Sequence, residues 1–299
     1  MILRPRFSSL RVSCSLRFST CRYSTVPTIP KEVSNHIDER NPLANSIQSS
    51  ERQFFVSTGV YNWPARPKED IHHGPETDSY LKLEQFVIYW STAVKHPPYR
   101  ILDCKSSHFC ALPCVHIYPD NLRLRFNDSR PTMQQVLHVQ KRWVYNKNVG
   151  DIPYVDVEPL PQNTVHIYVC THAERDFRCG VIGPLLVQQF QEYLKEPPEQ
   201  LAEKLQALDI QVFGCSHVGG HKFAGNMVIY KGTWKQGVWY GRVTPEDVDE
   251  IMRETVLEDK VIGKHWRGGL PDGKWDPEEG ISADEAEKRA DKWKCSCQT

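Results

Sequence analysis

The first 31 residues contain no aspartate or glutamate, and the first acidic residue of the chain is Glu32. The same stretch is rich in arginine and serine, and it lacks the continuous apolar centre of a secretory signal. This composition is typical of a mitochondrial transit peptide, the alternative being a disordered basic tail. We therefore expect residues 1–31 to be a transit peptide and the protein to be mitochondrial.

The chain also lacks an excess of charge and any long apolar run. Its 37 Lys and Arg residues balance 37 Asp and Glu residues, which removes the simplest argument for a nucleic-acid or membrane-surface partner. No stretch approaches the roughly 20 apolar residues of a membrane span. Nucleotide loops and nucleophile elbows are missing too. We expect no nucleic-acid partner and no membrane span.

From residue 51 onward the chain reads as two similar halves with a near-constant offset of about 111 to 112 residues. Cys104 falls on Cys215 and Tyr118 falls on Tyr230 at this offset. The predicted strands lie at 54–58, 100–102 and 115–118 in the first half and at 166–169, 210–213 and 227–230 in the second. The repeated pattern indicates a duplication.

Apolar residues three and four positions apart predict helices at about 80–94, 184–194 and 199–208. A final helix should begin after Thr244, a natural N-cap, with Asp247 in the capping-box position. Its buried face is expected to be Val248, Ile251, Met252, Thr255 and Val256. Strands that alternate with helices over short connections predict an α/β fold with a mixed sheet covered by helices.

Two pairs of potential metal ligands follow neighbouring strands of the second half. Cys170 and Cys179 flank a loop after one strand, and His217 and His221 lie four apart after the next. Strands that end side by side deliver their following loops to one place. Because thiolates and imidazoles are ligands of both zinc and iron–sulfur clusters, the spacing alone leaves a zinc ion and a [2Fe–2S] cluster open.

These histidines and cysteines also have ordinary structural interpretations that need no metal. A single histidine is usually a hydrogen-bonded core residue, and a single cysteine usually packs as a small apolar side chain. His172, inside the cysteine loop, is either a donor to a cluster sulfide or a surface residue. Cys215 is an alternative ligand or a redox thiol. Cys295 and Cys297 are close enough in the chain to be a redox pair.

Several sequence motifs favour the iron–sulfur cluster, with zinc as the second choice. The run YVCTH at 168–172, with Cys179 and Gly180 following, resembles the first cluster-binding loop of thioredoxin-like ferredoxins. The run CSHVGGHKFAGN at 215–226 resembles the second motif of the sucrase/ferredoxin-like family, and YGRVTPEDV at 240–248 resembles the strand and helix that follow. The run WRG at 266–268 resembles the tail motif of that family. With the transit-like N-terminus, the mitochondrial branch is the nearest match.

This resemblance implies a thioredoxin-like fold with a [2Fe–2S] cluster. One iron would be held by Cys170 and Cys179, and the other by His217 and His221. In the first half only Cys110 offers a ligand at an equivalent position, so a four-ligand site is not kept and this half is interpreted as a degenerate thioredoxin-like unit. A second metal site formed by Cys104, Cys110, Cys114 and His108 is the alternative to buried or free thiols there. The expected division is transit peptide 1–31, linker 32–50, degenerate unit 51–160, ferredoxin unit 161–262 and polar tail 263–299.

Three functional hypotheses follow. The first is a mitochondrial electron carrier or redox sensor, non-enzymatic, in the matrix rather than the intermembrane space because clusters are assembled there. Its partners would be an unidentified redox protein and the iron–sulfur assembly machinery. The second is a thiol–disulfide oxidoreductase or thiol sensor that uses Cys295 and Cys297, or Cys215. The third is a zinc-stabilised interaction module.

Overall fold

The computed structural model describes residues 26–47, 52–57, 99–105, 114–127, 135, 138–139, 152–234 and 236–269. Several predicted segments lie outside these residues. They are most of the transit peptide, the helix at about 80–94, and the part of the tail that holds Cys295 and Cys297.

The second half has the strand order of a thioredoxin-like fold. Its strands are β6 (Thr164–Cys170), β7 (Asp209–Cys215), β8 (Met227–Lys231) and β9 (Val238–Tyr240). Their order in the sheet is β9-β8-β6-β7, with β6 and β7 parallel and β8 antiparallel to both β6 and β9. Helices α4 (Phe177–Lys195) and α5 (Glu199–Gln206) connect the two parallel strands. The predicted fold class is therefore confirmed.

The first half repeats this order. Its strands are β1 (Arg52–Ser57), β2 (Tyr99–Lys105), β3 (Cys114–Tyr118) and β4 (Leu122–Phe126). β1 and β2 are parallel, β3 is antiparallel to β1, and β4 is antiparallel to β3, while β5 (Val155–Pro159) extends the edge. All six predicted strands are present within a few residues of the expected bounds. The same order in both halves supports the duplication.

One antiparallel edge joins the halves into a ten-stranded sheet, in the order β10-β9-β8-β6-β7-β2-β1-β3-β4-β5, where β10 is Trp266–Gly268. At this edge Cys104 pairs with Cys215 and Lys105 pairs with Gly214. Cys104 and Cys215 are also the residues that coincide when the two halves are aligned. A residue that lies opposite its own counterpart is what a local two-fold relation between the halves requires.

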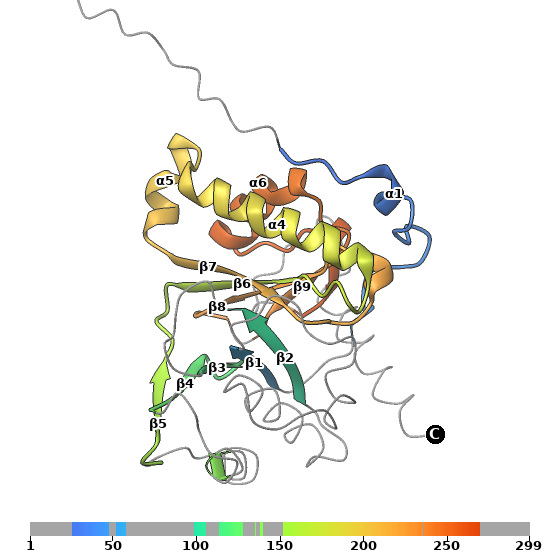
Figure 1. Cartoon of the computed structure of the whole chain (residues 1–299). Coiled ribbons are helices and arrows are strands. Elements are labelled where there is room, and N and C mark those ends of the chain that lie inside the picture. Colours follow the sequence, from blue (N-terminus) through green and yellow to red (C-terminus); the bar gives the residue numbers. More distant parts are fainter. Residues whose placement is uncertain are drawn as a thin grey trace, which may run out of the picture.

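The two halves face each other across this short edge, with helices α4, α5 and α6 (Val248–Glu250) on the far side of the second half (Figure 1). Phe55 of β1 stacks on Tyr168 of β6 with ring centroids 3.6 Å apart, although β2 and β7 lie between these strands in the sheet. Tyr118 stacks on its counterpart Tyr230 at 3.7 Å. The sheet must therefore bend sharply at the β2–β7 edge, so that aromatic side chains fill the space between the halves.

Two histidine–tyrosine pairs are buried in the same interface. His116 Nδ1 lies 2.7 Å from the Tyr168 hydroxyl, and His166 Nδ1 lies 2.5 Å from the Tyr118 hydroxyl. Burial, together with the nearby Arg123 charge, lowers the pKa of His116 to about 3. Burial also holds the pKa of His166 well below its usual value. Both imidazoles are therefore neutral at physiological pH.

The helix α4 begins earlier than predicted. The sequence placed its start at Pro184, but Asp176 is the N-cap and Pro184 lies inside the helix. The Asp176 carboxylate accepts the Arg178 N–H at 3.0 Å, which satisfies one of the unpaired donors of the first turn. Cys179 therefore lies in the first turn of α4 and not at the end of a long loop.

The final helix follows the prediction. Thr244 and Asp247 form a capping box, and the helix continues through α6 (Val248–Glu250) into a π-helical segment, Ile251–Leu257. All five residues of the predicted apolar face are buried: Val248, Ile251, Met252, Thr255 and Val256.

Two segments outside the predicted ferredoxin unit pack against it. Residues 26–47, which cover the end of the expected transit peptide and most of the expected linker 32–50, contain α1 (Lys31–Ser34) and bury Val33 and Leu43. Strand β10 (Trp266–Gly268), which the sequence interpretation placed in the polar tail, pairs with β9 at the edge of the sheet. The ordered body therefore extends in both directions beyond residues 161–262.

Acid should weaken the interface between the halves. A histidine whose pKa falls from 6.5 to about 3 on folding contributes stability that is complete above 6.5 and is lost as the pH drops towards 3. The expected loss is about 1.4 kcal/mol per pH unit for each such histidine within that window. Urea unfolding at several pH values measures it.

His116→Gln should flatten this pH dependence, whereas the exposed His36 offers a matched control in His36→Gln. An unchanged slope in His116→Gln would show that this imidazole does not carry the effect.

Candidate metal centre

Both candidate cysteines are buried at the end of β6. Cys170 is the last residue of that strand, Cys179 is in the first turn of α4, and each is 1% exposed. Gly183 lets the helix lie directly on the strand end, since a Cβ at this position would approach the Cys170 carbonyl oxygen to 2.2 Å. The two thiols are therefore enclosed between the strand and the helix.

The histidine loop follows the neighbouring strand β7. His217 and His221 are separated by Val218, Gly219 and Gly220, and the two glycines have φ values of 91° and 68°. Residues other than glycine rarely adopt positive φ values of this kind. A Cβ on Gly220 would also approach the Arg267 guanidinium to 2.2 Å. The loop therefore turns back on itself and places both imidazoles on the side of the cysteines.

Arg267 supports this loop from inside the protein. Its side chain is fully buried, and Nη1 donates to the Gly219 carbonyl at 3.0 Å and to Asn226 Oδ1 at 2.6 Å. Asn226 Nδ2 in turn donates to the Gly220 carbonyl at 3.0 Å. The sequence interpretation named Arg267 only within a tail motif and missed this role. A buried arginine is visible as such only after the fold is known.

The N-terminal segment holds the same loop from outside. Asp38 pairs with Lys222 Nζ at 3.1 Å, and its backbone N–H donates to the Lys222 carbonyl at 2.7 Å. Arg178 Nη1 donates to the His36 carbonyl at 2.9 Å, and Arg267 Nε donates to Ser46 Oγ at 3.0 Å. Residues 36–46 therefore contact the cysteine helix, the histidine loop and β10 together.

The sulfur of Cys170 is surrounded by donors. The Cys179 S–H is the strongest of them, followed by the His217 side chain and the backbone N–H groups of Val218 and His172. Together they hold the pKa of Cys170 well below its usual range, whereas the bond to Cys170 and burial raise the pKa of Cys179. The site favours negative charge on sulfur.

The two imidazoles lie side by side, with ring centroids 5.2 Å apart. The Nδ1 atoms of His217 and His221 are both buried, and neither makes a hydrogen bond within the described residues. His221 Nε2 lies 3.8 Å from Asp176 Oδ2, and its side chain is 41% exposed. Burial lowers the pKa of His221, which favours the neutral, ligating form of the ring.

The four predicted ligands are thus brought to one end of the β6–β7 pair. His172 is buried at 1% exposure, so the predicted surface role is wrong. Cys215 is fully buried, while Cys295 and Cys297 lie outside the described residues. Within the described residues no helix is long and apolar enough to cross a membrane.

A model of the sucrase/ferredoxin-like family matches residues 43–268. The chain belongs to the sucrase/ferredoxin-like family. Membership agrees with the motifs on which the resemblance was based, because the matched residues include both halves of the sheet and both candidate ligand loops.

Curated relatives include proteins of two different names. Altered inheritance of mitochondria protein 32 of Clavispora lusitaniae is 37% identical over 166 residues, which cover 52% of this chain and 57% of that protein. The protein of the same name in Debaryomyces hansenii is 36% identical over 169 residues, or 52% of this chain and 59% of that protein. Actin patches distal protein 1 of Saccharomyces cerevisiae is 34% identical over 246 residues, which cover 75% of this chain and 74% of that protein. The chain thus spans less than two thirds of the first two relatives.

A solved structure of a thioredoxin-like [2Fe–2S] ferredoxin from Aquifex aeolicus is also similar. It is 22% identical, with a TM-score of 0.27, and the match covers 37% of this chain and 96% of that chain. A TM-score this low does not support a fold assignment. The assignment rests on the strand order and connectivity of this protein.

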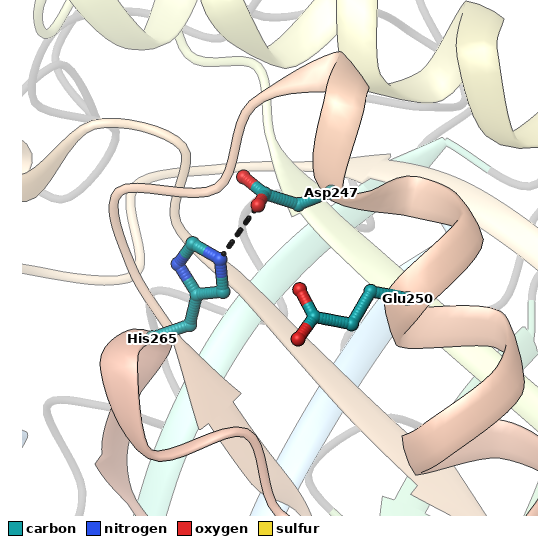
Figure 2. Close-up of side chains that lie close together, drawn as sticks. All are labelled: Asp247, Glu250 and His265. Atoms are coloured by element: carbon teal, nitrogen blue, oxygen red, sulfur yellow. Dashed lines mark ion pairs between the residues drawn. The ribbon is translucent and has the colours of Figure 1, made fainter.

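A second cluster of potential ligands lies away from the cysteines. Figure 2 shows Asp247, Glu250 and His265, whose ligand atoms all lie within 4.8 Å of one another. Lys264 Nζ already lies 3.0 Å from Asp247 Oδ1 and 2.7 Å from Glu250 Oε2, and His265 Nε2 lies 3.1 Å from the same Asp247 oxygen. Because the Lys264 ammonium group already pairs with both carboxylates, we interpret this cluster as an ion-pair network that ties the capping box to the start of β10.

Removing Asp247 should therefore destabilise the protein without any metal effect. Asp247→Ala removes a helix cap and the ion pairs of a partly buried carboxylate, and we expect a loss of about 1–3 kcal/mol in urea unfolding. Glu250→Gln is the control, since its exposed pair with Lys264 should contribute less than about 0.5 kcal/mol. Stabilisation by added Zn²⁺ or Mn²⁺ that vanished in Asp247→Ala would contradict the ion-pair interpretation.

Proposed function

We propose that this protein binds a [2Fe–2S] cluster and acts in mitochondria as a one-electron carrier or redox sensor, not as an enzyme. In this proposal Cys170 and Cys179 hold one iron, and His217 and His221 hold the other. The ligand set comes from the family resemblance, and the geometry of the loops supports it.

One observation carries the proposal. Two buried imidazole nitrogens, Nδ1 of His217 and Nδ1 of His221, make no hydrogen bond within the described residues, next to two buried thiols. A buried polar atom without a partner is costly, so such atoms usually have a partner or bind a ligand. Two sulfurs and two imidazole nitrogens are a donor set that [2Fe–2S] clusters accept.

The spread of the four residues favours a cluster over zinc. A tetrahedral zinc ion holds its ligand atoms about 3.3–3.8 Å apart. Within the described residues, the one group of three ligand-type side chains with all ligand atoms within 4.8 Å is Asp247, Glu250 and His265, and it includes none of the four candidates. Ligand pairs bound to two separate irons suit this wider spread.

The thiol–disulfide alternative receives no support from the described cysteines. Cys170 and Cys179 are 1% exposed and Cys215 is fully buried, so none of these sulfurs is open to a protein disulfide. Reactive cysteines need an accessible thiolate. The pair Cys295 and Cys297 remains as predicted from the sequence, outside the described residues.

In this proposal, different residues of the protein stabilise the charge of the centre and exchange a proton with solvent. When bound, the cluster supplies a single exchangeable electron. Cys170 lies among donors that stabilise negative charge on sulfur. His221 presents Nε2 towards Asp176 and solvent, where that nitrogen can hold or release a proton as the charge of the centre changes. α4 and β7 keep water away from the cysteine side.

Two further parts of the proposal concern the cell. The acid-free N-terminus and the names of the relatives support a mitochondrial location, and we propose the matrix. The partners we propose are a redox protein that exchanges electrons and the iron–sulfur assembly machinery that loads the site.

The cluster should be visible directly. Protein purified without oxygen should be red-brown, should bleach with dithionite and should then give an EPR signal. His217→Ala and Cys179→Ala should lose most of the visible absorption, because each removes one ligand. Glu203→Ala, an exposed position on α5, is the matched control and should stay coloured.

A colourless protein that holds about one zinc ion would contradict the cluster and favour the interaction module. A colourless protein without metal would favour the thiol hypothesis, in which Cys295 and Cys297 are the redox pair.

The N-terminus should be sufficient for import. Residues 1–31 fused to a fluorescent protein should direct it to mitochondria, because the segment is basic and free of acids. Replacing the five arginines of this segment with glutamine should abolish import. Protection from protease after rupture of the outer membrane would indicate the matrix, and digestion would indicate the intermembrane space.

A further inference from the structure

His172 is buried at the point where the cysteine loop meets the histidine loop. It lies two residues after Cys170, and its side chain is only 1% exposed. We propose that His172 is a positioning residue that fixes the histidine pair relative to the cysteine pair. This inference rests on the proposed cluster, but the contacts that carry it belong to the protein alone.

The first contact is with the cysteine side. The backbone N–H of His172 donates to the sulfur of Cys170. The backbone conformation of His172 is therefore tied to the position of that sulfur, and any ligand held by Cys170 would be held with it.

The second contact crosses to the other loop. His172 Nδ1 lies 3.1 Å from the backbone nitrogen of His217 and accepts its N–H. An accepting Nδ1 requires the ring to carry its proton on Nε2. The main chain of His217, from which the ligand side chain extends, is thereby attached directly to the cysteine loop.

The third contact leads to the remaining histidine. The His172 carbonyl accepts the backbone N–H of Asp176 at 3.2 Å. Asp176 caps α4, and its carboxylate lies 3.8 Å from His221 Nε2. Arg178 pairs with the same carboxylate at 2.8 Å and keeps it in place.

Through these bonds one residue is linked to all four candidate ligands. It touches Cys170 and His217 directly, reaches His221 through Asp176, and reaches Cys179 through the helix that Asp176 caps. Residues that hold metal ligands in this way commonly change metal retention by about 10–100-fold when they are replaced. The His217 backbone N–H needs an acceptor at this position, 3.1 Å away, and Nδ1 of the buried His172 supplies it.

Three substitutions test the position of the acceptor. His172→Asn places an amide oxygen near the site of Nδ1, His172→Gln extends the acceptor beyond it, and His172→Leu fills similar space without an acceptor. Hydrogen exchange of the His217 amide, measured in metal-free protein, reports the bond itself. We expect exchange about fivefold to tenfold faster in Leu and Gln variants and near wild type in Asn.

Iron-loaded protein gives the second readout. His172→Leu and His172→Gln should lose iron to a chelator about tenfold faster than wild type and show altered EPR g values, with both restored in His172→Asn. Wild-type exchange and spectra in His172→Leu, or equal rescue by Gln and Asn, would overturn the proposal. If wild-type protein binds no iron, the proposed function fails, and the amide measurement still decides whether His172 holds the loop.

Discussion

Parallel pairing of β6 with β7 places Cys170 opposite Cys215, and the candidate metal centre starts from that register. Both strands end at the same edge, so the loops that follow them meet there. The cysteine loop turns into α4 at Asp176, while the histidine loop turns back at Gly219 and Gly220. A shift of the pairing by one residue would reverse the side-chain faces and separate the two ligand pairs.

Buried polar groups then fix the loops in detail. The backbone carbonyls of Gly219 and Gly220 are satisfied by Arg267 and Asn226, and the His217 N–H is satisfied by His172. Because a buried donor or acceptor without a partner is costly, these bonds leave the histidine loop few alternatives. Within the described residues the Nδ1 atoms of His217 and His221 make no hydrogen bond, and a buried polar atom without a partner is a place where a ligand is expected.

The duplication explains the platform beneath the site. Both halves keep the same strand order and meet at an edge where Cys104 faces its counterpart Cys215. The first half contributes aromatic side chains to the contact between the halves, such as Phe55 stacked on Tyr168. The buried histidine–tyrosine pairs add hydrogen bonds to this contact, which makes the contact specific and sensitive to acid.

The sequence by itself determined the strands, the duplication, the final helix with its capping box, and the four candidate ligands, because these depend on local periodicity and on motifs. Tertiary structure alone decided the rest. Pro184 is a common helix-start signal, yet Asp176 caps α4 because the helix has to pack on the end of β6. The roles of Arg267, of residues 36–46 and of His172 come from long-range partners that satisfy buried polar groups. No local pattern encodes which distant residue supplies such a partner.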